Sequence, residues 1–79
     1  MEDNHQEYKQ FLEEQIQWCR KRDGILEKME LKLHEMKRIA EYTRIHELTS
    51  AEIDKLNDQL KELESEVHSL EKQLHVVLH

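Results

Sequence analysis

Apolar residues recur at helical spacing through the last third of the chain. From Ile53 onward they alternate in steps of three and four residues, and the positions beside them are polar. This spacing keeps the apolar residues on one narrow face of an α-helix and is typical of a helix that pairs with a neighbour. We therefore expect a helix over about residues 50–78, with its pairing face formed by Ile53, Leu56, Leu60, Leu63, Val67, Leu70, Leu74 and Val77.

A helix start is encoded immediately before this face. Thr49 is followed three residues later by Glu52, which is the spacing of a capping box. In that motif the threonine oxygen accepts from the amide of Glu52, and the glutamate reaches back to the amide of Thr49. Leu48 and Ile53 stand on either side of the cap as a matching hydrophobic staple. The pattern predicts that a new helix begins at Thr49.

The first half of the chain carries a second and wider apolar pattern. In heptad notation, Cys19 and Leu26 stand at a positions and Met29 at a d position. The flanking g positions hold Phe11, Trp18, Ile25 and Ile39, and Ile16 stands at e. A face wider than two rows is expected for a helix that packs against more than one neighbour. We expect this helix to cover about residues 3–46.

Gly24 is the one position where the first helix could be interrupted. Asp-Gly often marks a turn, and the preceding basic residues Arg20, Lys21 and Arg22 would suit a helix C-terminus. The heptad phase nevertheless continues across Gly24, and one glycine within a helix costs only about 1 kcal/mol. The pattern favours one long helix with a possible bend at Gly24.

The short connection between the two helices makes them antiparallel neighbours. When the a positions of one helix are paired with the d positions of the other across the turn, the two heptad patterns match along their length. Leu26 then lies opposite Leu70, and Leu33 lies opposite Leu63. Lys32 then faces Glu66. On the first helix, the predicted intrachain seam consists of Leu26, Met29, Leu33, Met36 and Ala40.

The second helix is too short to cover the first, so residues up to about Gln17 are expected to overhang. Apolar side chains grouped on an uncovered helix usually mark an interface. The predicted partner or dimer interface comprises Tyr8, Phe11, Leu12, Ile16, Trp18, Cys19, Ile25 and Ile39. Three alternatives could cover these apolar side chains. A second hairpin could complete a four-helix bundle, residues 3–22 could fold back as a third helix after a break at Gly24, or a different protein could bind.

Composition limits the function classes. The charged fraction is 38%, there is no proline and only one glycine, and this composition is typical of long helices. The net charge of −6 argues against nucleic-acid binding, which needs a basic face. No apolar run approaches membrane-spanning length, and the polar start is unlike a signal peptide. A single cysteine excludes an intrachain disulfide and fits a cytoplasmic setting.

The sequence offers few candidates for chemistry. His68, His75 and His79 could share part of a helix surface, but a metal site needs three or four converging ligands, so no metal or cofactor is expected. Cys19 is expected to be a small buried residue, although the nearby basic residues could also make its thiol reactive. Arg22 is a charged residue at a d position, among d positions that are otherwise mostly apolar. Its side chain could fix the register of the paired helices, or it could extend to solvent.

The expected fold is therefore a single all-α domain over residues 1–79, an antiparallel helical hairpin of coiled-coil type that dimerises into a four-helix bundle. The expected function is non-enzymatic: a self-associating scaffold built for protein–protein interaction, with a homodimer as the expected state. The alternative is a small regulatory adaptor or inhibitor that docks its N-terminal apolar face on a larger protein. A third reading is a piece of a larger coiled-coil assembly.

Overall fold

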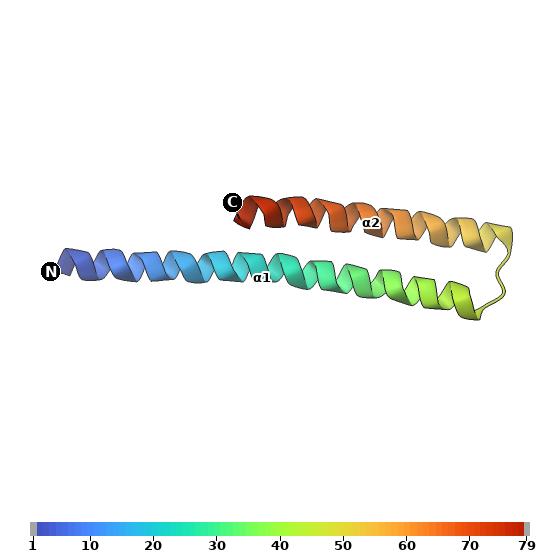
Figure 1. The fold of residues 1–79 in the computed structure, drawn as a ribbon, viewed down its shortest axis with the longest axis horizontal. Coiled ribbons are helices and arrows are strands. Elements are labelled where there is room, and N and C mark those ends of the chain that lie inside the picture. Colours follow the sequence, from blue (N-terminus) through green and yellow to red (C-terminus); the bar gives the residue numbers. More distant parts are fainter. Residues whose placement is uncertain (1, 79) are drawn as a thin grey trace.

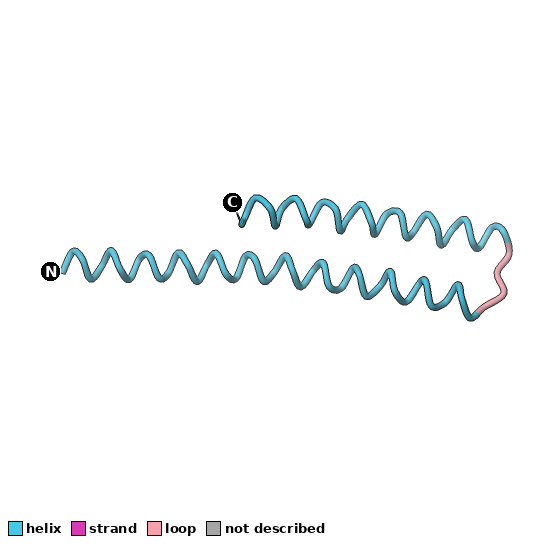
Figure 2. Tube along the Cα trace, in the orientation of Figure 1, coloured by secondary structure: helices cyan, strands magenta, loops and turns pink. Residues whose placement is uncertain are grey.

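The computed structural model describes the backbone of residues 2–78 and the side chains of residues 4–78. The chain forms two helices, α1 over Glu2–Ile45 and α2 over Ser50–Leu78. They run antiparallel and side by side, joined by one short loop, in a body of 72 × 19 × 12 Å (Figures 1 and 2). The predicted all-α helical hairpin is thus confirmed.

The first helix is continuous. α1 passes through Gly24 without a break, and no glycine among the described residues has a positive φ. Residues 3–22 therefore belong to the same helix as the rest of α1 and do not form a third one. Its last turn is closed by the amide of His46, which donates to the carbonyl of Tyr42 at 3.1 Å. The heptad phase that continues across Gly24 was the decisive signal, because the cost of one helical glycine is small compared with the packing of a whole helix.

Replacing Gly24 with alanine is expected to stabilise the hairpin by about 0.5–1 kcal/mol, because alanine restricts the unfolded chain and favours the helix. A Cβ atom at this position would meet nothing within 4 Å, so the native structure has room for it. Urea unfolding followed by circular dichroism measures the effect. A destabilised variant would show that Gly24 serves a bend or a close contact in solution.

The start of α2 is fixed by the predicted cap. The amide of Glu52 donates to Thr49 Oγ1 at 3.2 Å, and the amide of Ile53 donates to the Thr49 carbonyl at 3.0 Å. Thr49 thus satisfies helix-terminal amides that would otherwise lack a partner. The reciprocal bond from the Glu52 side chain is absent among the described residues, so only the threonine half of the capping box is formed.

The core lies along the middle of the interface between the helices. On α2, the buried residues are Leu63, Val67 and Leu70, and each is exposed by less than a tenth. Leu56, Leu60, Leu74 and Val77 are half-buried along the same face. Ile53, at the loop end, is exposed. Apart from Ile53, this face of α2 follows the predicted pairing row.

The first helix uses a different row from the one expected. The residues of α1 that are buried or half-buried against α2 recur in steps of four and three, and we call them the inner row: Trp18, Arg22, Ile25, Met29, Lys32, Met36 and Ile39. In heptad terms, α1 turns its d and g positions toward α2. Leu26, Leu33 and Ala40, which were expected in this seam at a positions, are exposed instead.

The wide apolar face of α1 explains this rotation. Because a, d and g positions are all largely apolar, either adjacent pair of rows can face a single neighbour. The g positions carry the bulkier Trp18, Ile25 and Ile39, whereas the a positions include the smaller Cys19 and Ala40. Burying the larger apolar side chains removes more surface from water, which favours the d and g rows.

Candidate interaction surface

The open end of the hairpin is closed by a tryptophan. The Trp18 indole Nε1–H donates to the main-chain carbonyl of Val77 at 2.5 Å. The two residues are 59 positions apart in the sequence, so this hydrogen bond joins α1 to the end of α2. The last carbonyls of a helix have no partner within it, so this bond satisfies one of them in α2. The guanidinium carbon of Arg22 lies 5.1 Å from the centre of the same ring, within the range of a cation–π contact. Trp18 therefore belongs to the hairpin itself.

Beyond Trp18, α1 continues without a neighbouring helix (Figure 1). We call residues 4–17 the overhang. Four apolar side chains of this segment are exposed: Tyr8 by 63%, Phe11 by 54%, Leu12 by 42% and Ile16 by 51%. All four were expected at the partner interface. Their exposure leaves a helical segment whose apolar side chains have no covering within the hairpin.

A second uncovered apolar stripe runs along α1 beside the inner row. We call it the outer row; its members are seven residues apart and are Leu12, Cys19, Leu26, Leu33 and Ala40. Leu26 is exposed by 43% and Leu33 by 51%, while Cys19 is half-buried. The outer row connects the overhang with the part of α1 that packs on α2. Ile25 and Ile39, also expected at an interface with a partner, lie in the inner row instead.

The inner row contains one ion pair that the sequence predicts. Lys32 Nζ lies 2.7 Å from Glu66 Oε2. The hydrogen bond to Glu66, together with the charge of that carboxylate, raises the pKa of Lys32 above its ordinary value of 10.5. Both side chains remain more than a third exposed, so solvent weakens the pair and its main effect is on the alignment of the helices.

This ion pair predicts a pH dependence. Since the pKa of Lys32 is raised by folding, the pair stabilises the hairpin fully below pH 10.5 and stops doing so as the pH rises through the folded-state pKa. The difference in unfolding free energy between the wild type and Lys32→Met should therefore shrink between about pH 7 and pH 11.5. Lys28→Met, at an exposed position of α1, is the control. A difference that stays constant with pH would contradict the prediction.

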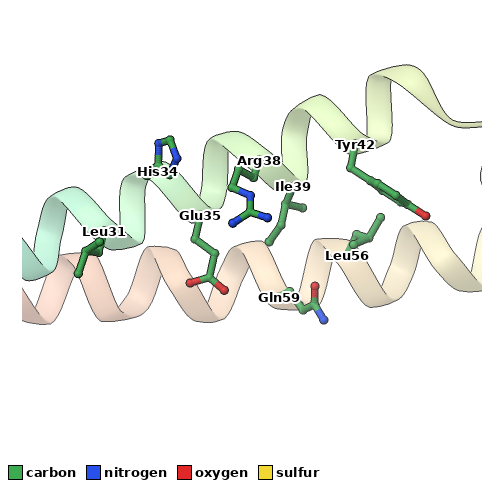
Figure 3. Close-up of a pocket in the computed structure, with 8 residues that line it drawn as sticks. All are labelled: Leu31, His34, Glu35, Arg38, Ile39, Tyr42, Leu56 and Gln59. Atoms are coloured by element: carbon green, nitrogen blue, oxygen red, sulfur yellow. The ribbon is translucent and has the colours of Figure 1, made fainter.

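The hairpin has a shallow groove near the turn (Figure 3). Ile39 and Tyr42 of α1 point toward α2 beside Leu56, whereas His34 points away from α2. Tyr42 also contacts His46, with ring centroids 4.2 Å apart. The groove is open along its length and bounded by two helices only, so it lacks the enclosure typical of a small-molecule site.

The remaining titratable side chains are dispersed. Within the described part of the chain, no group of three His, Cys, Asp or Glu residues is arranged to hold a metal ion. His68 Nδ1 lies 3.6 Å from Glu71 Oε2, one helical turn away. His79, which was considered with His68 and His75 as a possible metal ligand, lies outside the described residues. Across residues 2–78, no helix is long and apolar enough to cross a membrane.

Sequence reasoning located the overhang but missed two features of the hairpin. The hydrogen bond of Trp18 to the end of α2 could have been inferred from its position level with the last turn of that helix. The burial of Ile25 does not follow from periodicity, because the a, d and g positions of the first helix are all largely apolar and only the size of their side chains separates them. Comparison of the chain with protein-family models, curated proteins and solved structures gave no match.

Proposed function

We propose that this chain is a non-enzymatic protein–protein interaction module that associates with itself, with two hairpins forming a four-helix bundle of coiled-coil type. The observation that carries the proposal is the uncovered apolar surface of α1, formed by the overhang and the outer row. Fully burying one large apolar side chain contributes about 1.5–3 kcal/mol, so burial of this surface in a partner would stabilise the chain substantially.

The size of the protein supports the same proposal. A chain of 79 residues can bury only a small core, and among the side chains described, those of residues 4–78, four are exposed by less than a tenth. Small chains without disulfides or metals commonly gain stability by oligomerisation. The single cysteine also fits the proposed cytoplasmic setting, where disulfides are rare.

Sedimentation velocity over a concentration series tests self-association. We expect a species of twice the 9.7 kDa chain mass, with a dimer fraction that rises with concentration. The thermal midpoint should rise with concentration as well, because dimerisation is linked to folding. A chain that remains monomeric at high concentration would exclude the proposal.

The overhang supports a second candidate, a small adaptor or inhibitor that docks on a larger protein. Tyr8 and Leu12 are uncovered, lie four residues apart on one side of α1, and belong to a segment of that helix that has no neighbour in the hairpin (Figure 1). Apolar anchors on one side of a helix are the usual means of entering a groove on a partner. This candidate is favoured over self-association if the isolated chain is monomeric and residues 4–17 exchange their amide hydrogens rapidly.

A further inference from the structure

We propose that the side of the overhang in line with the inner row is a docking site for an amphipathic helix of another protein, and that basic residues border the apolar face of that helix. Tyr8 and Phe11 supply the apolar contacts, and Glu7 and Glu14 supply the charge. The inference rests on the second candidate function and names the chemistry of the partner. It leaves the outer row available for self-association.

The side of α1 that faces α2 continues into the overhang. Going back from Trp18, steps of three, four and three residues lead to Gln15, Phe11 and Tyr8. Because α1 is one unbroken helix, these residues lie in line with the inner row. α2 ends level with Trp18, so Phe11 and Tyr8 remain exposed by 54% and 63% (Figure 1). A helix placed end to end with α2 would contact both aromatic side chains.

Acidic residues border this side of the overhang. Glu7 lies four residues before Phe11 and Glu14 three residues after it, so both are neighbours of Phe11 on the helix surface. Both are exposed, and neither forms an ion pair among the described residues 4–78. Lys9 and Glu13 each stand two residues from Phe11 and therefore lie on another side of the helix. An apolar face bordered by carboxylates favours a partner with a basic border.

The sign of the charge along α1 changes where α2 ends. Residues 18–45, which lie alongside α2, contain eight Lys or Arg and five Asp or Glu. α2 has the opposite balance over residues 50–78, with three basic and seven acidic residues. The overhang, residues 4–17, has one basic and three acidic residues. The hairpin thus pairs a basic stretch with an acidic helix, and the acidic overhang is complementary to a basic neighbour.

A second copy of this chain does not provide such a helix. Its α2 and its overhang are both acidic, and either one would add acidic residues beside Glu7 and Glu14. Its basic stretch already has one side against its own α2. The apolar row that this stretch leaves exposed is bordered by acidic residues, since Leu26 has Asp23 three residues before it and Glu30 four residues after it. The partner is therefore a different protein.

Two synthetic peptides that differ only at the borders of one apolar face test this chemistry. Each is about 21 residues long, with leucine at the a and d positions and either lysine or glutamate at all e and g positions. Like charges at the borders oppose pairing of a peptide with itself. Fluorescence anisotropy of each labelled peptide, titrated with the full chain, gives the dissociation constant. We expect the lysine-bordered peptide to bind at least about tenfold more tightly, and this preference to shrink at high salt.

Variants of the chain locate the site. Phe11→Ala should weaken binding of the lysine-bordered peptide at least about tenfold, because it removes the central apolar contact. Glu14→Lys should weaken it by a similar factor, since repulsion replaces attraction at the border. Glu13→Lys is the matched control: it changes the net charge equally, lies on another side of the helix, and should alter the dissociation constant less than about twofold at physiological salt. Circular dichroism checks that each variant keeps its helices.

The outcomes separate this proposal from the functions on which it builds. No binding of the lysine-bordered peptide, or equal binding of both peptides, would overturn it. Equal effects of Glu14→Lys and Glu13→Lys would also overturn it, because binding would then follow only the net charge of the chain. Binding that requires Phe11 and is unaffected by Glu14→Lys would refute the basic partner and leave the adaptor function standing. Self-association is measured without peptide, so its failure is a separate result.

Discussion

Replacing Leu70 with alanine is expected to lower the free energy of unfolding by about 2–3 kcal/mol, at the lower end of the range for buried leucines. Leu70 is exposed by 9% and stands in the most buried part of the interface. Its truncation removes apolar contacts and leaves a cavity that two rigid helices can fill only partly. Folded domains of this kind are stable by only about 5–15 kcal/mol, so the loss is a large share of the total.

Leu31→Ala is the matched control for Leu70→Ala. Leu31 is exposed by 64%, and the same chemical change should alter stability by less than about 0.5 kcal/mol. Urea unfolding of both variants, measured at the same protein concentration, separates burial from helix propensity. Equal destabilisation by the two substitutions would show that Leu70 is not part of a packed core in solution.

The second large effect is expected at Trp18. Trp18→Ala should destabilise the hairpin by about 2–3 kcal/mol, less than for a fully buried tryptophan because the side chain is only half-buried. Trp18→Phe keeps most of the ring but removes the Nε1–H donor to Val77, and should cost about 1 kcal/mol. Comparing the two separates packing from the hydrogen bond.

Hydrogen exchange locates the effect of Trp18. Both substitutions should increase amide exchange in the last turns of α2, with much less change near Thr49 at the opposite end of the hairpin. Leu31→Ala is the control, because Leu31 is 64% exposed and lies outside the overhang and the outer row. Uniform acceleration along α2 would show that Trp18 supports the whole hairpin and not its open end.

The sequence was sufficient to predict the hairpin because several independent signals agreed. The spacing of the apolar residues from Ile53 onward, the cap at Thr49 and the continuous phase across Gly24 each depend on local geometry. The ion pair between Lys32 and Glu66 also followed from the antiparallel arrangement. These features involve one helix, or two helices whose connection leaves little choice of orientation.

The rotation of α1 was harder to predict. Leu26 and Leu33 suit a helix interface as well as Ile25 does, and periodicity gives only the set of apolar rows. The choice depends on how side-chain shapes from both helices fit together, which is a property of the pair. The same ambiguity applies to the candidate interface, where residues of the predicted set are divided between the inner row, the outer row and the overhang.

The single loop of this hairpin also determines the order in which its contacts can form. Residues next to the turn meet after closure of a very short loop, whereas Trp18 and Val77 are 59 positions apart and meet only after the helices have paired progressively from the turn. Unfolding should begin in reverse, by separation at the open end. Apart from cleavage in the exposed loop itself, protease sensitivity of a folded sample should therefore appear first near both termini, while the last turns of α1 and the first turns of α2 remain protected until the helices separate completely.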